Sequence, residues 1–324
     1  MKRPFGWGFL GSGSISATVA REVRSLPDAG RLVGVWGRDS EKTRNLAVAE
    51  EFERAYDDVG ALLADDEIDA VYIALPHHLH VDAVLRSLDA RKHVLCEKPL
   101  GISAAEVARI LDHPQASSHA VAEGFMIRHH PQWRWIMEMI ASGVVGSVRA
   151  VQAHSCLKLP VKDDAHLPDE QGLLLDIGCY SVHLARAIFR AEPVDVFARE
   201  ESDTLITAHM RFDSGYAHLL VSSSLYPARR LHILGTCGSI EVFNPIHPSP
   251  EGISLVRQVS EDGVVEKRFP AMRQYGEQFA NFVAAVLNNE PPLVPLQDAF
   301  GNAKALDAIR QSARSKQSIQ IERE

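Results

Sequence analysis

Gly8-Phe9-Leu10-Gly11-Ser12-Gly13-Ser14-Ile15-Ser16-Ala17 follows an apolar run and opens a stretch with helical periodicity. Gly11 and Gly13 match the first two glycines of the dinucleotide-binding pattern: the first permits a tight turn, and the second lets the backbone approach a pyrophosphate. Amides at the start of the helix would then face the phosphates. The third position is Ser16 rather than glycine or alanine. The match is therefore incomplete, and a strand-to-helix turn without a ligand is the alternative.

The sequence around this loop alternates between two patterns. Amphipathic stretches typical of helices cover residues 15–25, 41–53, 80–90 and 103–111. Short apolar runs typical of strands cover residues 7–10, 32–36, 70–75, 93–96 and 120–123. This alternation predicts right-handed βαβ units, and hence an α/β Rossmann domain with a doubly wound parallel sheet. We place this NAD(P)-binding domain at residues 1–122.

The pattern changes after residue 123. One helix is expected near residues 132–141, and helices near 275–287 and 297–314 close the chain. Between them, alternating residues predict strands at 148–154, 204–212, 216–224, 230–234, 239–243 and 253–259. Asp213-Ser214-Gly215 reads as a hairpin turn. Residues 123–324 are therefore expected to form an α+β domain with a mainly antiparallel sheet.

The composition excludes several classes of protein. The chain has 324 residues, of which 46% are hydrophobic, and its formal charge is 34 − 42 = −8. Such a chain is globular and has no bulk attraction for nucleic acid or an anionic membrane. No apolar run approaches the ~20 residues that span a bilayer, and the first residues do not resemble a signal peptide. The four cysteines are widely spaced without a C-x-x-C pair, which indicates reduced thiols in a cytoplasmic protein.

The residues after the second expected strand bear on the choice of cofactor. An NAD-preferring domain usually places a carboxylate there to bind the ribose 2′-hydroxyl. Here the strand runs into Gly37-Arg38-Asp39. Gly37 leaves space, and Arg38 can pair with a 2′-phosphate, which favours NADP over NAD. Asp39 keeps NAD open, and a solvated loop cation is the other interpretation of Arg38.

Lys98 is placed by the proline that follows it. The stretch Glu97-Lys98-Pro99 comes after an apolar strand, and the proline ends that strand. Lys98 then lies at the carboxyl end of a parallel strand, where open α/β sheets bind ligands. A surface lysine at a strand end is the alternative.

Several motifs together resemble one protein family. They are the glycine loop, Pro76-His77-His78-Leu79-His80, Glu97-Lys98-Pro99 and Asp176-Ile177-Gly178-Cys179-Tyr180. In this order and spacing they resemble the glucose-fructose oxidoreductase / inositol dehydrogenase / MocA family (Gfo/Idh/MocA). The resemblance includes residues 123–131, spans nearly the whole chain and thins after about residue 250. The Asp-x-Gly-x-Tyr form is similar to the branch with dimeric dihydrodiol dehydrogenase, glucose-fructose oxidoreductase and D-xylose dehydrogenase.

The resemblance implies both a fold and an activity. It implies a Rossmann domain followed by an open sheet whose outer face pairs two subunits, and hence a homodimer or higher homo-oligomer. It also implies reversible hydride transfer between a nicotinamide and a carbinol carbon of a sugar, polyol or cyclic diol. It places Lys98 beside the reacting oxygen. The residues expected to bind the cofactor are Gly11, Ser12, Gly13, Ser14, Ile15, Gly37, Arg38, Leu75, Pro76, His80, Glu97 and Lys98.

The second candidate group lies between residues 172 and 183, which read as a loop entering a helix. Residues three or four apart share a helix face, so Asp176, Tyr180 and His183 are expected to line one side. Tyr180 beside Lys98 suits proton transfer, because an ammonium stabilises a phenolate; a desolvated Lys98 can also act directly. Asp176 would accept a substrate hydroxyl or orient Lys98, and His183 would do the same or only contact substrate.

Each of these assignments has a plainer alternative. A tyrosine on an amphipathic helix commonly packs in the core, and an aspartate at a helix start is commonly an N-cap. Arg128 is expected to reach cofactor or substrate, or else to form an interdomain ion pair. No metal site is expected, because adjacent histidines such as His129 and His130 point in different directions and no further ligand has suitable spacing.

Two rival functions remain open from the sequence. Some relatives use tightly held NAD to cleave a glycosidic bond, and a nicotinamide-binding regulatory module needs no chemistry. Residues 159–171 are expected to shape the substrate pocket, but their composition does not identify a substrate.

Overall fold

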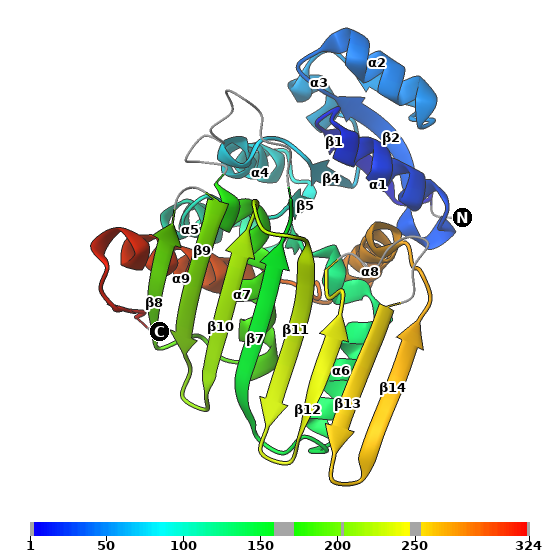
Figure 1. Ribbon diagram of the computed structural model, residues 1–324. Coiled ribbons are helices and arrows are strands. Elements are labelled where there is room, and N and C mark those ends of the chain that lie inside the picture. Colours follow the sequence, from blue (N-terminus) through cyan, green and yellow to red (C-terminus); the bar gives the residue numbers. More distant parts are fainter. Residues whose placement is uncertain (1–2, 159–171, 202–203, 247–253, 323–324) are drawn as a thin grey trace. The chain divides into compact units, whose positions relative to one another are not determined.

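The computed structural model describes residues 3–158, 172–201, 204–246 and 254–322, which fold into two compact units (Figure 1). The first unit holds residues up to His129 together with Arg273–Phe300, and the second holds His130–Met272 and the residues from Gly301 onward. Within the described residues, no helix combines the length and the apolarity needed to cross a bilayer.

The first unit contains a six-stranded parallel sheet in the order β3-β2-β1-β4-β5-β6. The order reverses between β1 and β4, which is the switch point where doubly wound sheets bind ligands. This confirms the predicted Rossmann fold. The strands are β1 (Gly6–Leu10), β2 (Arg31–Trp36), β3 (Arg54–Tyr56), β4 (Ala70–Ile73), β5 (His93–Glu97) and β6 (Val121–Gly124).

Helices follow the strands as right-handed crossovers require. Three of them follow the capping residues Asp39, Asp58 and Ser103, whose side chains accept a hydrogen bond from a first-turn amide. The helices of this unit are α1 (Ser14–Arg24), α2 (Ser40–Ala49), α3 (Val59–Leu63), α4 (His80–Asp89), α5 (Ala104–Leu111) and α8 (Gln274–Asn288).

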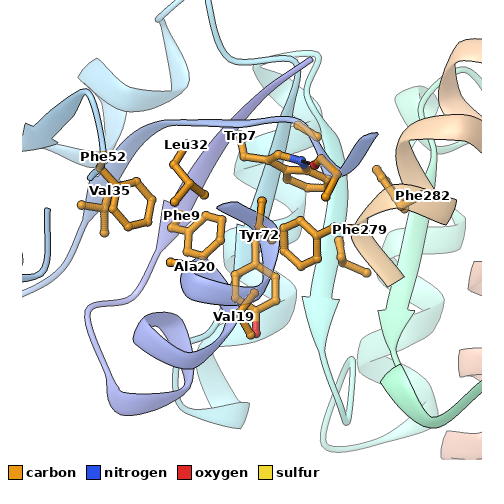
Figure 2. Close-up of a cluster of buried hydrophobic side chains, with 14 of the residues drawn as sticks. Trp7, Phe9, Val19, Ala20, Leu32, Val35, Phe52, Tyr72, Phe279 and Phe282 are labelled. Atoms are coloured by element: carbon orange, nitrogen blue, oxygen red, sulfur yellow. Dashed lines mark hydrogen bonds between the residues drawn. The ribbon is translucent and has the colours of Figure 1, made fainter. Parts of the chain in front are cut away.

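Aromatic side chains from distant parts of the sequence form the core of the first unit (Figure 2). Trp7 of β1 lies with its ring centroid 4.4 Å from that of Phe279 on α8, and Phe9 lies 4.8 Å from Tyr72 on β4. All four side chains are completely buried. Burial of this apolar area holds α8 in the first unit, although the sequence-based division at residue 122 places it with the second domain.

The second unit contains a nine-stranded sheet in the order β14-β13-β12-β11-β7-β10-β9-β8-β15. Only β7 and β10 pair in parallel, and every other neighbouring pair is antiparallel. The prediction of a mainly antiparallel sheet is confirmed. The strands are β7 (Val148–Cys156), β8 (Asp195–Glu201), β9 (Leu205–Arg211), β10 (Tyr216–Ser222), β11 (Ala228–Gly235), β12 (Gly238–Phe243), β13 (Ser254–Ser260), β14 (Gly263–Phe269) and β15 (Ile319–Gln320).

The two faces of this sheet differ in character. Helices α6 (Pro131–Ala141) and α7 (Cys179–Phe189) lie on the same side of the sheet (Figure 1). Side chains on the side of α7, such as Ala153, Leu219 and Leu231, are buried. Strand alternation places Tyr216 on the opposite face, where it is 51% exposed. Helix α9 (Leu296–Ser315) begins in the first unit and continues in the second.

Candidate functional site

The glycine turn after β1 has the geometry that a pyrophosphate needs. Gly11 has φ +123°, and a Cβ added there would lie 2.3 Å from the carbonyl oxygen of Ala74, so only glycine fits. Gly13 precedes α1 in an extended conformation and has no side chain to cap the first amides of the helix. A Cβ added at Gly13 would meet no atom within 4 Å. Open space and uncapped amides at a helix start fit a phosphate group.

The buried side chain of Ser16 explains the departure from the glycine pattern. Its hydroxyl donates a hydrogen bond of 2.8 Å to the carbonyl oxygen of Gly11 and is fully buried. Ser16 therefore closes the turn from within and leaves the approach to Gly13 open.

The loop after β2 lies against the glycine turn. At Gly37 an added Cβ would be 2.3 Å from the Ser12 hydroxyl, so glycine allows this close approach. Asp39 caps α2 by accepting a hydrogen bond of 3.0 Å from the Lys42 amide. Arg38 is exposed, and across the described ranges its guanidinium forms no ion pair. Asp39, the carboxylate that could have favoured NAD, is thus used to cap α2, whereas Arg38 has no ion-pair partner among the described residues.

His80 ties together the ends of β4 and β5. Its Nε2 lies 2.8 Å from the carbonyl oxygen of Leu75, and its Nδ1 lies 2.8 Å from that of Pro99. Burial lowers the pKa of this fully buried imidazole. The ring therefore supports the turn that carries Lys98, where the Lys98–Pro99 peptide bond is cis.

Two buried carboxylates surround the same turn. Glu97 accepts a hydrogen bond of 2.8 Å from the Tyr72 hydroxyl, and burial beside Glu97 raises the pKa of Tyr72 well above its usual value. Glu123, at the end of β6, accepts a hydrogen bond of 2.8 Å from the Leu100 amide. The sequence analysis did not single out Tyr72 or Glu123 as site residues, because both lie within apolar runs that predict buried strands.

Residues expected to bind the cofactor thus gather at the carboxyl ends of β1, β2, β4 and β5. Ser12 meets Gly37, Gly11 meets the backbone after β4, and His80 links Leu75 to the turn that carries Lys98. Neighbouring strands that point the same way bring these ends to one edge of the sheet.

The second group of candidates lies at the start of α7. Asp176 is part of a wide π-helical turn, Leu174–Gly178, rather than a loop, and α7 follows directly. Tyr180 and His183 are both buried and, three residues apart on α7, share a face. Asp176 lies in the π-helical turn, which has more residues per turn than an α-helix, so the α-helical spacing that predicted one face for all three residues does not apply to it. Single π-helical turns are frequent at functional sites.

Arg128 is a further candidate. Arg128 belongs to the short turn Met126–His129 at the end of the first unit, whereas Tyr180 belongs to the second unit. Burial lowers the pKa of the neighbouring His129 to about 3. In the part of the chain that the structure describes, no three histidine, cysteine or acidic residues are grouped as metal ligands. The expected pocket loop, residues 159–171, lies outside the described residues.

Comparisons with known proteins cover both units. Residues 5–125 match the family model described as "Oxidoreductase family, NAD-binding Rossmann fold", and residues 133–241 match the "GFO/IDH/MocA C-terminal domain".

Individual relatives match over most of the chain. An uncharacterized oxidoreductase, ORF334 of Rhizobium meliloti, is 35% identical over 95% of this chain and 96% of its own. A D-xylose 1-dehydrogenase (NADP(+)) of Haloferax volcanii is 32% identical over 87% of this chain and 90% of its own. Among solved structures, a 3-ketoreductase of Actinomadura kijaniata in complex with NADP and TDP-benzene has a TM-score of 0.83 and 26% identity, over 96% of this chain and 98% of that one.

Proposed function

This chain belongs to the GFO/IDH/MocA family of oxidoreductases, and from that premise we propose that it transfers a hydride between NADP and a carbinol or carbonyl carbon of a sugar, polyol or cyclic diol. The observation that carries the proposal is the glycine turn at Gly11 and Gly13, which is shaped for a dinucleotide and lies at the same sheet edge as Lys98. The name of the D-xylose 1-dehydrogenase among its relatives includes NADP(+), and the 3-ketoreductase structure is a complex with NADP.

The first unit would hold the cofactor. Amides from Gly11 to Ile15 would bind the pyrophosphate, and Arg38 beside Gly37 would bind the 2′-phosphate. Leu75, Pro76, Glu97 and Lys98 would line the path toward the nicotinamide. When bound, the nicotinamide supplies or accepts the hydride at its C4 atom.

Proton transfer falls to side chains of the chain itself. Tyr180 would take the hydroxyl proton of the substrate during oxidation and return a proton to the carbonyl oxygen during reduction. The Lys98 ammonium would stabilise the negative charge that develops on that oxygen. Asp176, His183 and Arg128 would orient the substrate by hydrogen bonds to its other hydroxyl groups.

A substrate screen tests the proposal. Sugars, polyols and dihydrodiols would be offered with NADP and with NAD, and formation of reduced nicotinamide would be followed by its near-ultraviolet absorbance. We expect turnover with at least one compound, faster with NADP. Cleavage of a glycoside without net formation of reduced nicotinamide would favour the glycoside-cleaving alternative. Tight cofactor binding without turnover of any compound would favour a regulatory module.

We also propose that the protein works in the cytoplasm as a homodimer that pairs through the face of the nine-stranded sheet opposite α7. Exposed Tyr216 on that face supports this proposal. Light scattering of the purified protein should give twice the mass of the chain, and Tyr216→Glu should shift it toward the monomer. A wild-type mass equal to one chain would contradict it.

A further inference from the structure

Arg229 occupies an unusual position for a charged residue. It lies on β11, on the face of the sheet that α7 covers, in line with Leu231 and Ile233, which are both buried. The strand register places it opposite Ser155 on β7. Its carbonyl oxygen accepts a hydrogen bond of 3.3 Å from the Asn244 amide on the other side. The side chain of Arg229 therefore points toward the layer that contains α7.

The start of α7 lies directly over this row of residues. The hydroxyl groups of Ser181 and Ser155 form a hydrogen bond of 2.9 Å. A Cβ added at Gly178 would lie 3.6 Å from Val221, which pairs with Ser155 on the neighbouring strand. Tyr180 lies between Gly178 and Ser181 in the sequence. It therefore belongs to the first turn of α7, which packs over the row of sheet residues that includes Arg229.

Among the described residues, Arg229 forms no ion pair with an acidic side chain. The guanidinium is half-buried, and nowhere in the described ranges does a carboxylate lie within 4.0 Å of it. Arg186, on α7 in the same unit, shows the usual alternative: its guanidinium binds both carboxylate oxygens of Glu192, one of them at 2.7 Å. Burial lowers the pKa of Arg229, and interaction with the Tyr180 phenol opposes that shift. A half-buried cation without a counter-ion is costly unless a partner becomes anionic.

Within four residues of Tyr180 the sequence holds no lysine or arginine. Asp176 precedes it by four residues and His183 follows it by three, and Cys179 is its buried neighbour. On this face β7 and β10 contribute uncharged side chains beside Ser155, such as Ala153, Leu219 and Val221. Arg229 is thus the positive side chain that the described sheet face presents to the start of α7.

We infer that Arg229 is a positioning residue for the proposed reaction: its guanidinium stabilises Tyr180 as a phenolate and so prepares it to act as the base. This inference rests on the proposed function. During oxidation the phenolate oxygen would take the substrate hydroxyl proton and become a neutral phenol, and the hydride of the carbon that bears this hydroxyl would pass to the bound nicotinamide. During reduction the phenol gives its proton to the carbonyl oxygen, and Arg229 balances the charge that returns to the phenolate.

The test compares pH profiles of kcat/KM for oxidation in the wild type, Arg229→Gln and Arg229→Lys. An opposite charge within a few ångströms shifts an ionisation by about one unit or more, so the acid limb of Arg229→Gln should move up by at least about one pH unit. At pH values below this limb, kcat/KM of Arg229→Gln should be about tenfold lower than that of the wild type, and at high pH it should return to the wild-type value. Arg229→Lys should keep the limb close to the wild-type position. Arg230→Gln is the matched control, because Arg230 is the next residue on β11 but is exposed on the opposite face, over Phe243.

Two results would overturn the inference. One is an unchanged limb in folded Arg229→Gln. The other is a raised KM for substrates with a carboxylate or phosphate group and no movement of the limb, which would make Arg229 a substrate-binding group instead.

A second readout separates this inference from the proposed function, because it needs no turnover. Ultraviolet difference spectra follow tyrosine ionisation directly, and subtraction of the Tyr180→Phe titration isolates Tyr180. We expect this phenol to ionise at higher pH in Arg229→Gln than in the wild type, even if no substrate is found. Identical titrations of Tyr180 in the two proteins would refute the role of Arg229, whatever the screen shows.

Discussion

Removal of Arg38 should change the choice between the two nicotinamide cofactors. Arg38 is exposed at the end of β2 and forms no ion pair with any described residue, so its guanidinium can meet a 2′-phosphate without breaking a bond within the protein. A hydrogen bond to a charged group contributes about 1.5–3 kcal/mol. Because 1.4 kcal/mol corresponds to a factor of ten, Arg38→Ala should weaken NADPH binding by about ten- to a hundredfold. NADH, which lacks the phosphate, should bind almost as before.

Fluorescence titration of the reduced cofactors measures both dissociation constants without a substrate. Arg44→Ala is a matched control, since Arg44 is an exposed arginine on α2 that pairs with Asp57 at 3.3 Å. It should leave both constants unchanged. Our reasoning would be refuted if Arg38→Ala weakened NADPH and NADH by the same factor, or if it left NADPH binding intact. A wild type that binds NADH more tightly than NADPH would also remove the argument for Arg38.

Three further predictions concern catalysis, the core and pH. Lys98→Met should lower kcat by about a hundredfold or more while NADPH still binds, as fluorescence titration would show; full activity would remove Lys98 from the mechanism. Phe279→Ala should lower the free energy of unfolding by about 3–5 kcal/mol in urea, because its buried ring packs on Trp7 of β1; a loss below about 1 kcal/mol would show that α8 contributes little to this core. Burial lowers the pKa of His93 to about 4, and its Nδ1 accepts a hydrogen bond of 3.0 Å from the Ala120 amide, so the folded state holds it neutral. Stability should therefore fall as pH drops from about 6.5 to about 4, where the unfolded chain binds the proton first, and His93→Asn should show a shallower decline; equal slopes in urea denaturation would contradict this assignment.

Elements with a strong apolar signal could be predicted from the sequence, and weak ones could not. Strands β1 and β4 are buried along their length and β5 at all but its first residue, so a short apolar run marks each of them in the sequence. Strand β3 has only three residues, two of them exposed, and β14 is exposed at all but its last residue. Neither leaves an alternating pattern to find. Both lie at an edge of their sheet, where pairing on one side only demands little burial.

The candidate site divides in the same way, according to sequence distance. The glycine turn and Glu97-Lys98-Pro99 are contiguous motifs whose roles follow from local backbone geometry. The neighbourhood of Arg229 and Tyr180 depends on the register of β7 with β11 and on a serine pair between sheet and helix. Similarly, α8 belongs to the first unit because its aromatic residues pack on β1, which lies some 270 residues earlier in the sequence. Such pairings depend on the tertiary structure and have no local signature.

The late position of α8 in the gene has a consequence for biosynthesis. The ribosome releases every strand of the parallel sheet before it has made the helix that covers Trp7 and Phe9. At roughly 5–20 residues per second, the stretch from His129 to Asn288 takes on the order of ten to thirty seconds to translate. During that interval the nascent nucleotide-binding half carries uncovered aromatic rings, which are the kind of surface that chaperones bind. A gene cut after residue 129 would make that exposure permanent.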